Sequence, residues 1–313
     1  MISIVIPTRN RYDDLIECLD SILYSQKLPE HEIIVIDNNS SDSTRFLEEH
    51  YPNIKVIRNK TNLGLAAARN IGALESKGKY VLFIDDDNVI APNMIWLLHD
   101  FMELHNDVGI LAPAVMYYDN KEVVWHIGTL MNLMTSKPRG FVQYQSYIDC
   151  KNKVIDVDNV DNIFIVRKDK GDEVRWFDDK LFLFYTEVDL CQKIAKKGYK
   201  IQTFCEAKAW HKTQLPGRKD FSLRTYGFNR TFRAYFLARN RVIIMKRYAK
   251  KVNFIIFFLV IYPIFNLFYI FRILCYKKIK ICFMYIKGVL DGYYFVITNK
   301  IRNSINDQLD KEL

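Results

Sequence analysis

The sequence lacks the cysteine patterns of disulfide-rich and zinc-binding proteins. Its 313 residues include six cysteines, with no CxxC pair and no cysteine–histidine cluster of zinc-site spacing. We therefore expect reduced thiols facing the cytosol, and neither a disulfide framework nor a structural zinc site. The opening residues MISIVIP lead directly into a strand-like run, without the charged and apolar segments of a secretory signal peptide.

Two common phosphate-binding motifs are also missing. No GxGxxG follows the first apolar run, and GxxxxGK[ST] does not occur in the chain. These motifs supply the glycine-rich loops that hold dinucleotides and nucleoside triphosphates. Their absence removes the main support for either kind of site.

Charge divides the chain into two regions of opposite sign. Residues 1–215 carry 26 Lys and Arg against 31 Asp and Glu, whereas residues 216–313 carry 19 against 5. A chain of this length can hold two modest domains. The sequence therefore predicts one domain over 1–215 and a basic, helical, membrane-associating region over 216–313.

Apolar runs alternate with helical patterns in the first hundred residues. The strand-like runs are 3–7, 32–37, 54–59 and 80–85, and the helical patterns cover 13–26, 43–50 and 65–76. This alternation predicts an α/β fold with a doubly wound, mostly parallel sheet. Ligands of such sheets bind beyond the carboxyl ends of the strands.

Three consecutive carboxylates, Asp85, Asp86 and Asp87, end the run KYVLFI. They repel one another unless a cation lies nearby. Alternate residues of an extended segment point the same way, so Asp85 and Asp87 can converge on one divalent ion. The alternative is that the carboxylates favour the N-terminus of a helix beginning near Pro92.

Other polar residues have both a structural and a functional interpretation. Glu187 and Asp189 begin a helical pattern, where acids also complement the helix dipole. Arg69 is either a solvated helix residue or a cation for phosphate. His211 follows a short strand, and a lone histidine is more often structural than a ligand.

The basic region contains twenty residues without a formal charge, 252–271, which is enough to cross a bilayer core. Basic residues lie at both ends, and Pro263 and Asn266 interrupt the run. This pattern favours a re-entrant or in-plane helix slightly over a true span, and a buried core helix is the third alternative. Residues 285–297 predict a second interfacial element. No nucleic-acid-binding motif is present, so we expect a membrane partner and no nucleic acid.

Taken together, these segments resemble glycosyltransferase family 2, the inverting enzymes of the GT-A fold. The resemblance covers residues 1–215 and is carried by SIVIPTRNR, IIVIDNNSSDST, NLGLAAARNIGA, YVLFIDDDNVIAP, FYTEVDLCQKIAKKGYKI and AWHK. The basic region resembles members that extend lipid-linked or cell-surface glycans, of which bacterial rhamnosyltransferases are the nearest type.

The resemblance implies a nucleotide-sugar site at the strand ends. At the family's DxD position, Asp85 and Asp87 would hold Mn²⁺ or Mg²⁺ against the donor diphosphate, and Asp86 would contact the ribose. The other implied donor-binding residues are Pro7, Thr8, Arg9, Asp37, Asn38 and Arg69. Many members have a second aspartate where this chain has Asn38, so the base is left open.

The resemblance also implies the catalytic residues. Glu187 would be the base that deprotonates the acceptor hydroxyl, with Asp189 as the second choice, and Thr186 replaces a more common acid. His211 matches a metal or diphosphate ligand. The implied activity is metal-dependent, inverting transfer of a sugar to a lipid-linked or cell-surface glycan, such as one on a polyprenyl carrier. The enzyme would lie on the anionic cytoplasmic face of a membrane.

Two other functions remain open at this point. A membrane-bound scaffold that binds nucleotide sugars without catalysis would explain Thr186, but not the retention of the other acidic residues. A nucleotidyltransferase also uses paired carboxylates and a metal. It is expected to have a glycine-rich loop after the first strand, and PTRNRYDD contains no glycine.

Overall fold

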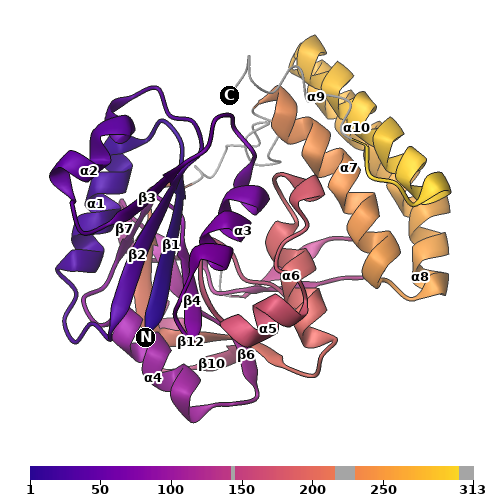
Figure 1. The fold of residues 1–313 in the computed structure, drawn as a ribbon. Helices are drawn as coiled ribbons and strands as arrows, with labels where there is room; N and C mark the ends of the chain where they lie inside the picture. Colours follow the sequence, from indigo (N-terminus) through magenta and orange to yellow (C-terminus); the bar gives the residue numbers. More distant parts are fainter. Residues whose placement is uncertain (142–144, 216–229, 303–313) are drawn as a thin grey trace. The chain divides into compact units, whose positions relative to one another are not determined.

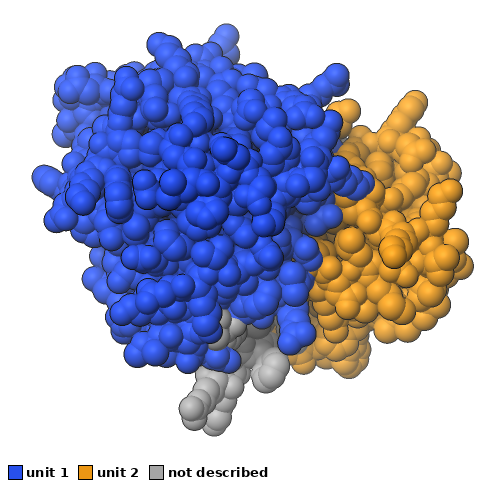
Figure 2. Space-filling view, turned by 90° about the horizontal axis from the view of Figure 1, so that it is seen from below, with its two compact units in different colours: residues 1–130, 139–179, 187–215 blue, residues 131–138, 180–186, 216–313 orange. Residues whose placement is uncertain are grey.

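The computed structural model describes residues 1–141, 145–215 and 230–302. The chain forms two compact units, which we call the sheet unit and the helical unit (Figures 1 and 2). The sheet unit comprises residues 1–130, 139–179 and 187–215, and the helical unit comprises 131–138, 180–186 and the chain from 216 onward. The domain boundary predicted at residue 215 stays a prediction, and the region predicted to follow it begins outside the described residues.

The sheet unit is built on a mixed sheet of order β10-β12-β6-β11-β4-β1-β2-β3. Strands β4, β1, β2 and β3 are parallel, and β11 is antiparallel to both of its neighbours, β4 and β6. The predicted α/β class is confirmed. The strands are β1 (Ile2–Thr8), β2 (His31–Asp37), β3 (Lys55–Arg58), β4 (Tyr80–Ile84), β5 (Asn88–Ile90), β6 (Val108–Tyr117), β7 (Asn120–His126), β10 (Val154–Asp156), β11 (Ile163–Arg167) and β12 (Lys200–His211), with a separate pair β8 (Thr129–Met131) and β9 (Pro138–Gly140).

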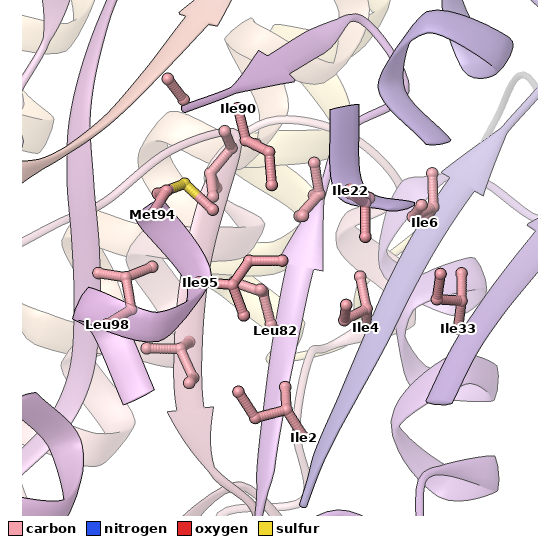
Figure 3. Packing of buried hydrophobic residues seen from close by; sticks show 14 of the residues in the cluster. Ile2, Ile4, Ile6, Ile22, Ile33, Leu82, Ile90, Met94, Ile95 and Leu98 are labelled. Carbon is pink, nitrogen blue, oxygen red and sulfur yellow. The ribbon is translucent and has the colours of Figure 1, made fainter. Parts of the chain in front are cut away.

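Helices cover both faces of this sheet because side chains alternate along its strands. Ile4 and Leu82 belong to one buried cluster with residues of α1 and α4 (Figure 3). Val5 and Phe83 belong to the opposite cluster with residues of α3 and α6. The helices are α1 (Tyr12–Leu23), a 3₁₀ turn η1 (Ser43–Phe46) with α2 (Leu47–His50), α3 (Leu65–Glu75), α4 (Met94–Leu104), α5 (Lys168–Glu173) and α6 (Thr186–Ala195), with 3₁₀ turns η2 (Tyr147–Asp149) and η3 (Asp179–Leu181).

The helical unit contains α7 (Thr231–Tyr248), α8 (Lys251–Ile256), a π-helical turn η4 (Phe257–Ile261), α9 (Tyr262–Cys275) and α10 (Ile279–Thr298). Helices α7 and α10 pack side by side (Figure 1). They approach so closely that a Cβ on Gly288 would overlap the carbonyl oxygen of Tyr235.

Two stretches of the helical unit are long and apolar enough to cross a membrane, Lys251–Cys275 and Ile279–Thr298. The first carries large apolar side chains that the protein leaves uncovered. Leu259 is 67% exposed, Leu267 70% and Phe271 64%. An apolar surface of this kind is typical of a partner or membrane interface.

Candidate active site

The register of the sheet brings the predicted site residues to one edge. Thr8, at the end of β1, pairs with Asp37, at the end of β2. Asp85 follows the end of β4, where Ile84 pairs with Ile163, the first residue of antiparallel β11. The carboxyl edge of the parallel strands therefore also receives the chain that enters β11.

Arg69 on α3 connects two of the predicted functional carboxylates. Its Nη2 lies 2.6 Å from Oδ1 of Asp85, and its Nη1 donates to Oε1 of Glu187. The side chain is fully buried, with its guanidinium carbon 5.4 Å from the ring centre of Phe164. Burial raises the pKa of Asp85, and the positive charge of Arg69, which lowers it, offsets this effect only in part. Arg69 thus fixes the Asp85 and Glu187 side chains relative to each other.

Asp86 faces the end of β1. Thr8 Oγ1 donates a hydrogen bond to Asp86 Oδ2 over 2.7 Å. Burial, together with the charge of Asp87, raises the pKa of Asp86 to about 8. The three adjacent carboxylates, Asp85 to Asp87, therefore carry more negative charge than their surroundings stabilise. The mutual repulsion inferred from the sequence has the same cause.

Asp87 has two basic partners. Its Oδ2 lies 3.2 Å from Nε2 of His211 and 2.8 Å from Nη1 of Arg11. Burial opposes ionisation of Asp87, but the hydrogen bond and charge of His211 and the charge of Arg11 lower its pKa to about 2. Nδ1 of His211 is buried and has no hydrogen-bond partner in the part of the chain that the structure describes.

The residues around Asp87 fit a divalent cation shared with a substrate. Nε2 of His211 and Oδ2 of Asp87 lie 3.2 Å apart, so an imidazole and a carboxylate are close enough to serve as ligands of one ion, although Oδ2 also accepts from Arg11. Among the described residues, no group of three or more His, Cys, Asp and Glu side chains is arranged to hold a metal ion. A small protein ligand set is usual for Mg²⁺, which takes its remaining ligands from phosphates and water. Asp85, the other predicted metal ligand, is bonded to Arg69, and its role in holding a metal stays a prediction.

Asp37 and Asn38 are held by the loops that surround them. Asp37 Oδ1 accepts from the backbone N–H of Ser40 over 2.8 Å. The side-chain oxygen of Asn38 accepts two hydrogen bonds, from Asn59 Nδ2 and from the N–H of Leu63. The role predicted for Asn38 in recognising the base stays a prediction. In this structure the Asn38 oxygen already accepts hydrogen bonds from the protein.

Arg9 has two guanidinium nitrogens that lack partners. Nε and Nη1 of Arg9 are buried and make no hydrogen bond with the described residues. Arg9 directly follows Thr8, which bonds Asp86, and Pro7 lies on the same strand. A buried donor without an acceptor is costly, so Arg9 is suited to an anionic ligand.

Asp189, the second candidate base, pairs within its own helix. Its Oδ2 lies 3.2 Å from Nζ of Lys193, four residues later. Sequence analysis missed two other charged residues of this edge, Arg11 and Asp161. Burial and the charges of Glu187 and Asp85 raise the pKa of Asp161 to about 7. The proximity of Arg11 to Arg9 in the motif TRNR was a usable signal, whereas nothing in the sequence singled out Asp161.

Comparison with known proteins gives the class of this fold. Residues 3–172 match the family model described as glycosyl transferase family 2. An uncharacterised glycosyltransferase of Haemophilus influenzae is 38% identical over 115 residues, which are 36% of this chain and 39% of the relative. A poly(ribitol-phosphate) β-glucosyltransferase of Bacillus spizizenii is 37% identical over 107 residues, covering 32% of this chain and 17% of the relative. The match thus spans less than half the length of either relative.

Two solved structures share the fold. GalNAc-T7 with UDP, GalNAc and Mn²⁺ has a TM-score of 0.56 at 17% identity, covering 77% of this chain and 50% of that chain. S. aureus TarS 1-349 in complex with UDP-GlcNAc has a TM-score of 0.54 at 19% identity, covering 78% and 66%. The fold and the acidic strand end define a GT-A protein, as predicted. Because the family model covers more than half of the chain, this protein belongs to glycosyl transferase family 2.

Proposed function

We propose that this protein is an inverting glycosyltransferase that moves a sugar from a nucleoside diphosphate sugar to a hydroxyl of a membrane-held glycan. The observation that carries the proposal is the connected set of carboxylates at the sheet edge. Arg69 joins Asp85 to Glu187, and Asp87 adjoins His211. In this proposal Asp87 and His211 would be the metal-binding pair, and Glu187 would be the separate catalytic carboxylate.

The donor would bind along the ends of β1 and β4. Asp87 and His211 would hold Mn²⁺ or Mg²⁺, which supplies Lewis-acid stabilisation of a leaving diphosphate. The unpartnered nitrogens of Arg9 would donate to the same diphosphate, and Asp86 and Asp37 would contact the nucleoside. Solved relatives of this fold contain UDP or UDP-GlcNAc, so uridine donors are the first to test.

Glu187 would accept the proton of the acceptor hydroxyl as that oxygen attacks the sugar from the face opposite the diphosphate. One displacement of this kind inverts the anomeric centre. Arg69 holds Glu187 from the side of Asp85, so the base and the donor-binding row keep a fixed spacing. The rhamnosyltransferase type remains a prediction.

The acceptor would be carried by a membrane lipid such as a polyprenyl phosphate or diphosphate. Uncovered apolar side chains on α9 and the basic residues of the helical unit support attachment to an anionic, cytoplasmic membrane surface.

The test is to incubate the purified chain with Mn²⁺ or Mg²⁺ and a panel of nucleotide sugars, with and without membrane acceptor. We expect release of nucleoside diphosphate that increases with acceptor, and an inverted linkage by nuclear magnetic resonance. Release of pyrophosphate would instead identify a nucleotidyltransferase. Donor binding without turnover of any donor would identify a scaffold.

A further inference from the structure

The loop that leads into Glu187 is bonded to helix α7 through its backbone. This loop, residues 180–185, begins within η3 and ends just before Thr186, the first residue of α6. Asn240 Nδ2 lies 2.9 Å from the carbonyl oxygen of Leu181, 2.8 Å from that of Leu183 and 3.0 Å from that of Phe184. Both the loop and α7 belong to the helical unit.

Arg239, the preceding residue of α7, bonds the beginning of the same loop. Its Nη2 donates to the carbonyl oxygen of Lys180 over 2.7 Å, and its Nε donates to Oδ1 of Asn240 over 2.9 Å. Arg239 and Asn240 are fully buried. Buried carbonyl groups need donors, and here side chains supply what regular secondary structure does not.

The loop has a backbone conformation that needs such support. Phe182, Phe184 and Tyr185 each have a φ of 62°, in the left-handed region that bulky residues rarely occupy. Their side chains are held as well, since Phe182 stacks on Phe236 of α7 with ring centres 4.9 Å apart. Strained residues of this kind persist only where their surroundings hold them.

We propose that Asn240, assisted by Arg239, is a positioning residue for Glu187. Glu187 follows Tyr185 by two residues, so the conformation at Tyr185 sets the direction in which α6 begins. Loosening the loop would change the placement of Glu187 while leaving the donor-binding residues of β1 and β4 in place. The catalytic consequence rests on the proposed role of Glu187 as base, whereas the loop contacts can be tested without it.

The matched control is Asn266 of α9. It is a buried asparagine of the same unit, 6% exposed, and accepts a hydrogen bond from the hydroxyl of Tyr285 over 2.8 Å. Asn266→Ala therefore also removes a buried hydrogen bond from the helical unit. Its partner Tyr285 lies on α10 and outside the loop at 180–185.

The experiment is hydrogen exchange, followed by mass spectrometry, on the full chain and its variants without substrate. We expect Asn240→Ala to speed exchange of peptides from 180–190 by about 10-fold or more, as for the loss of one or more buried hydrogen bonds. Asn266→Ala should leave these peptides unchanged. With the donor from the panel, Asn240→Ala should lower kcat by about 10-fold at unchanged donor KM.

Unchanged exchange over 180–190 in Asn240→Ala would overturn the proposal, and so would an equal increase in Asn266→Ala. If Asn240→Ala does not fold, Arg239→Lys tests the same point, because it keeps the charge but cannot reproduce both hydrogen bonds. A smaller increase in the same peptides supports the proposal, and no increase overturns it. The exchange result stands even if no donor is turned over, so failure of this inference is distinct from failure of the proposed function.

Discussion

Arg69 Nη2 lies 2.6 Å from Asp85 Oδ1, and the other terminal nitrogen of the same guanidinium bonds Glu187. One buried cation therefore joins the end of β4 to the start of α6, 118 residues apart in sequence. The two carboxylates have different roles in the proposed mechanism. Asp85 belongs to the donor-binding site, and Glu187 is the base.

We expect Arg69→Met to lower the free energy of unfolding by about 3 to 5 kcal/mol, because it leaves two carboxylates without their buried cation. Urea unfolding measures the change. Lys79→Met is the matched control, since its ion pair with Glu103 is 56% and 39% exposed and contributes about 1 kcal/mol or less. Losses of similar size in both variants would contradict the structural role of Arg69.

Arg9→Gln should weaken binding of UDP, or of the nucleotide that the donor panel identifies, by about 10-fold or more. Two buried nitrogens of Arg9 have no partner among the residues that the structure describes, so a diphosphate is expected to supply one. Isothermal titration measures the affinity. Arg45→Gln, on the exposed surface, should leave it unchanged, and an equal loss would mean that general charge attracts the nucleotide.

Asp87→Asn and Glu187→Gln should affect different steps. Asp87→Asn removes a charge of the proposed metal site, so donor binding should lose its dependence on Mn²⁺. Glu187→Gln removes the proposed base, so donor affinity should hold while turnover falls by about 10² to 10⁴-fold. Binding with and without chelator, compared with turnover, separates the two. If Glu187→Gln retained activity, the base would be reassigned to Asp189.

Stability should fall in mild acid because of His126. Burial and the charge of His211 lower the pKa of His126 to about 4, below its usual value near 6.5. The unfolded chain therefore binds a proton that the folded chain does not between these values. The stability that comes from keeping His126 neutral is fully present above about pH 6.5. It is lost as the pH falls toward 4, which lowers the free energy of unfolding by up to about 3 kcal/mol.

His126→Gln should flatten that part of the stability profile measured by urea unfolding over the same pH range. The exposed His50 provides the control, and His50→Gln should keep the wild-type slope. An unchanged slope in His126→Gln would show that other groups cause the acid sensitivity.

The uncovered face of α9 and its preceding turn should bind membranes. Replacing Leu259, Leu267 and Phe271 by Ser removes about 1.5 to 3 kcal/mol of burial for each side chain and should lower vesicle affinity at least about 100-fold in flotation assays. The control replaces Leu74 and Leu104 by Ser, because both are 72% exposed on the sheet unit. Equal losses would locate the membrane contact elsewhere.

Strong local patterns made the first half of the fold predictable. The strands β1, β2 and β4 contain the apolar stretches IVI, IIVI and YVLFI, and polar residues end or follow each strand, so their type and direction followed from sequence. The helix predicted over 43–50 is a 3₁₀ turn of 4 residues followed by an α-helix of 4 residues. That segment is too short for helical periodicity to distinguish the two.

Strand β6 was missed although all ten of its residues are buried. Gly109 and Pro113 interrupt its apolar pattern, and Pro113 lacks the N–H that a central strand normally donates. The neighbouring strand β12 accommodates this with a register shift between Phe204 and Lys208, opposite Pro113 and Ala114. Such compensation depends on a partner about ninety residues away and leaves no local signal.

The clustered acidic residues of the site could be predicted from the sequence. Their partners, which the packing of distant segments determines, could not. The repulsion among Asp85, Asp86 and Asp87 indicated a site from sequence alone. Their pairing with Arg11 and Arg69 could not be predicted, because it depends on how α1 and α3 pack against the sheet. The loop at 180–185 was also invisible, because its left-handed residues are aromatic and do not resemble a turn.

Gly288 gives the helical unit a mechanical property. With main chain against main chain at that point, α10 cannot slide along α7 without forcing a neighbouring side chain into the peptide of Tyr235. A force along α10, such as the proposed membrane contact would apply, is therefore expected to move α7 together with α10.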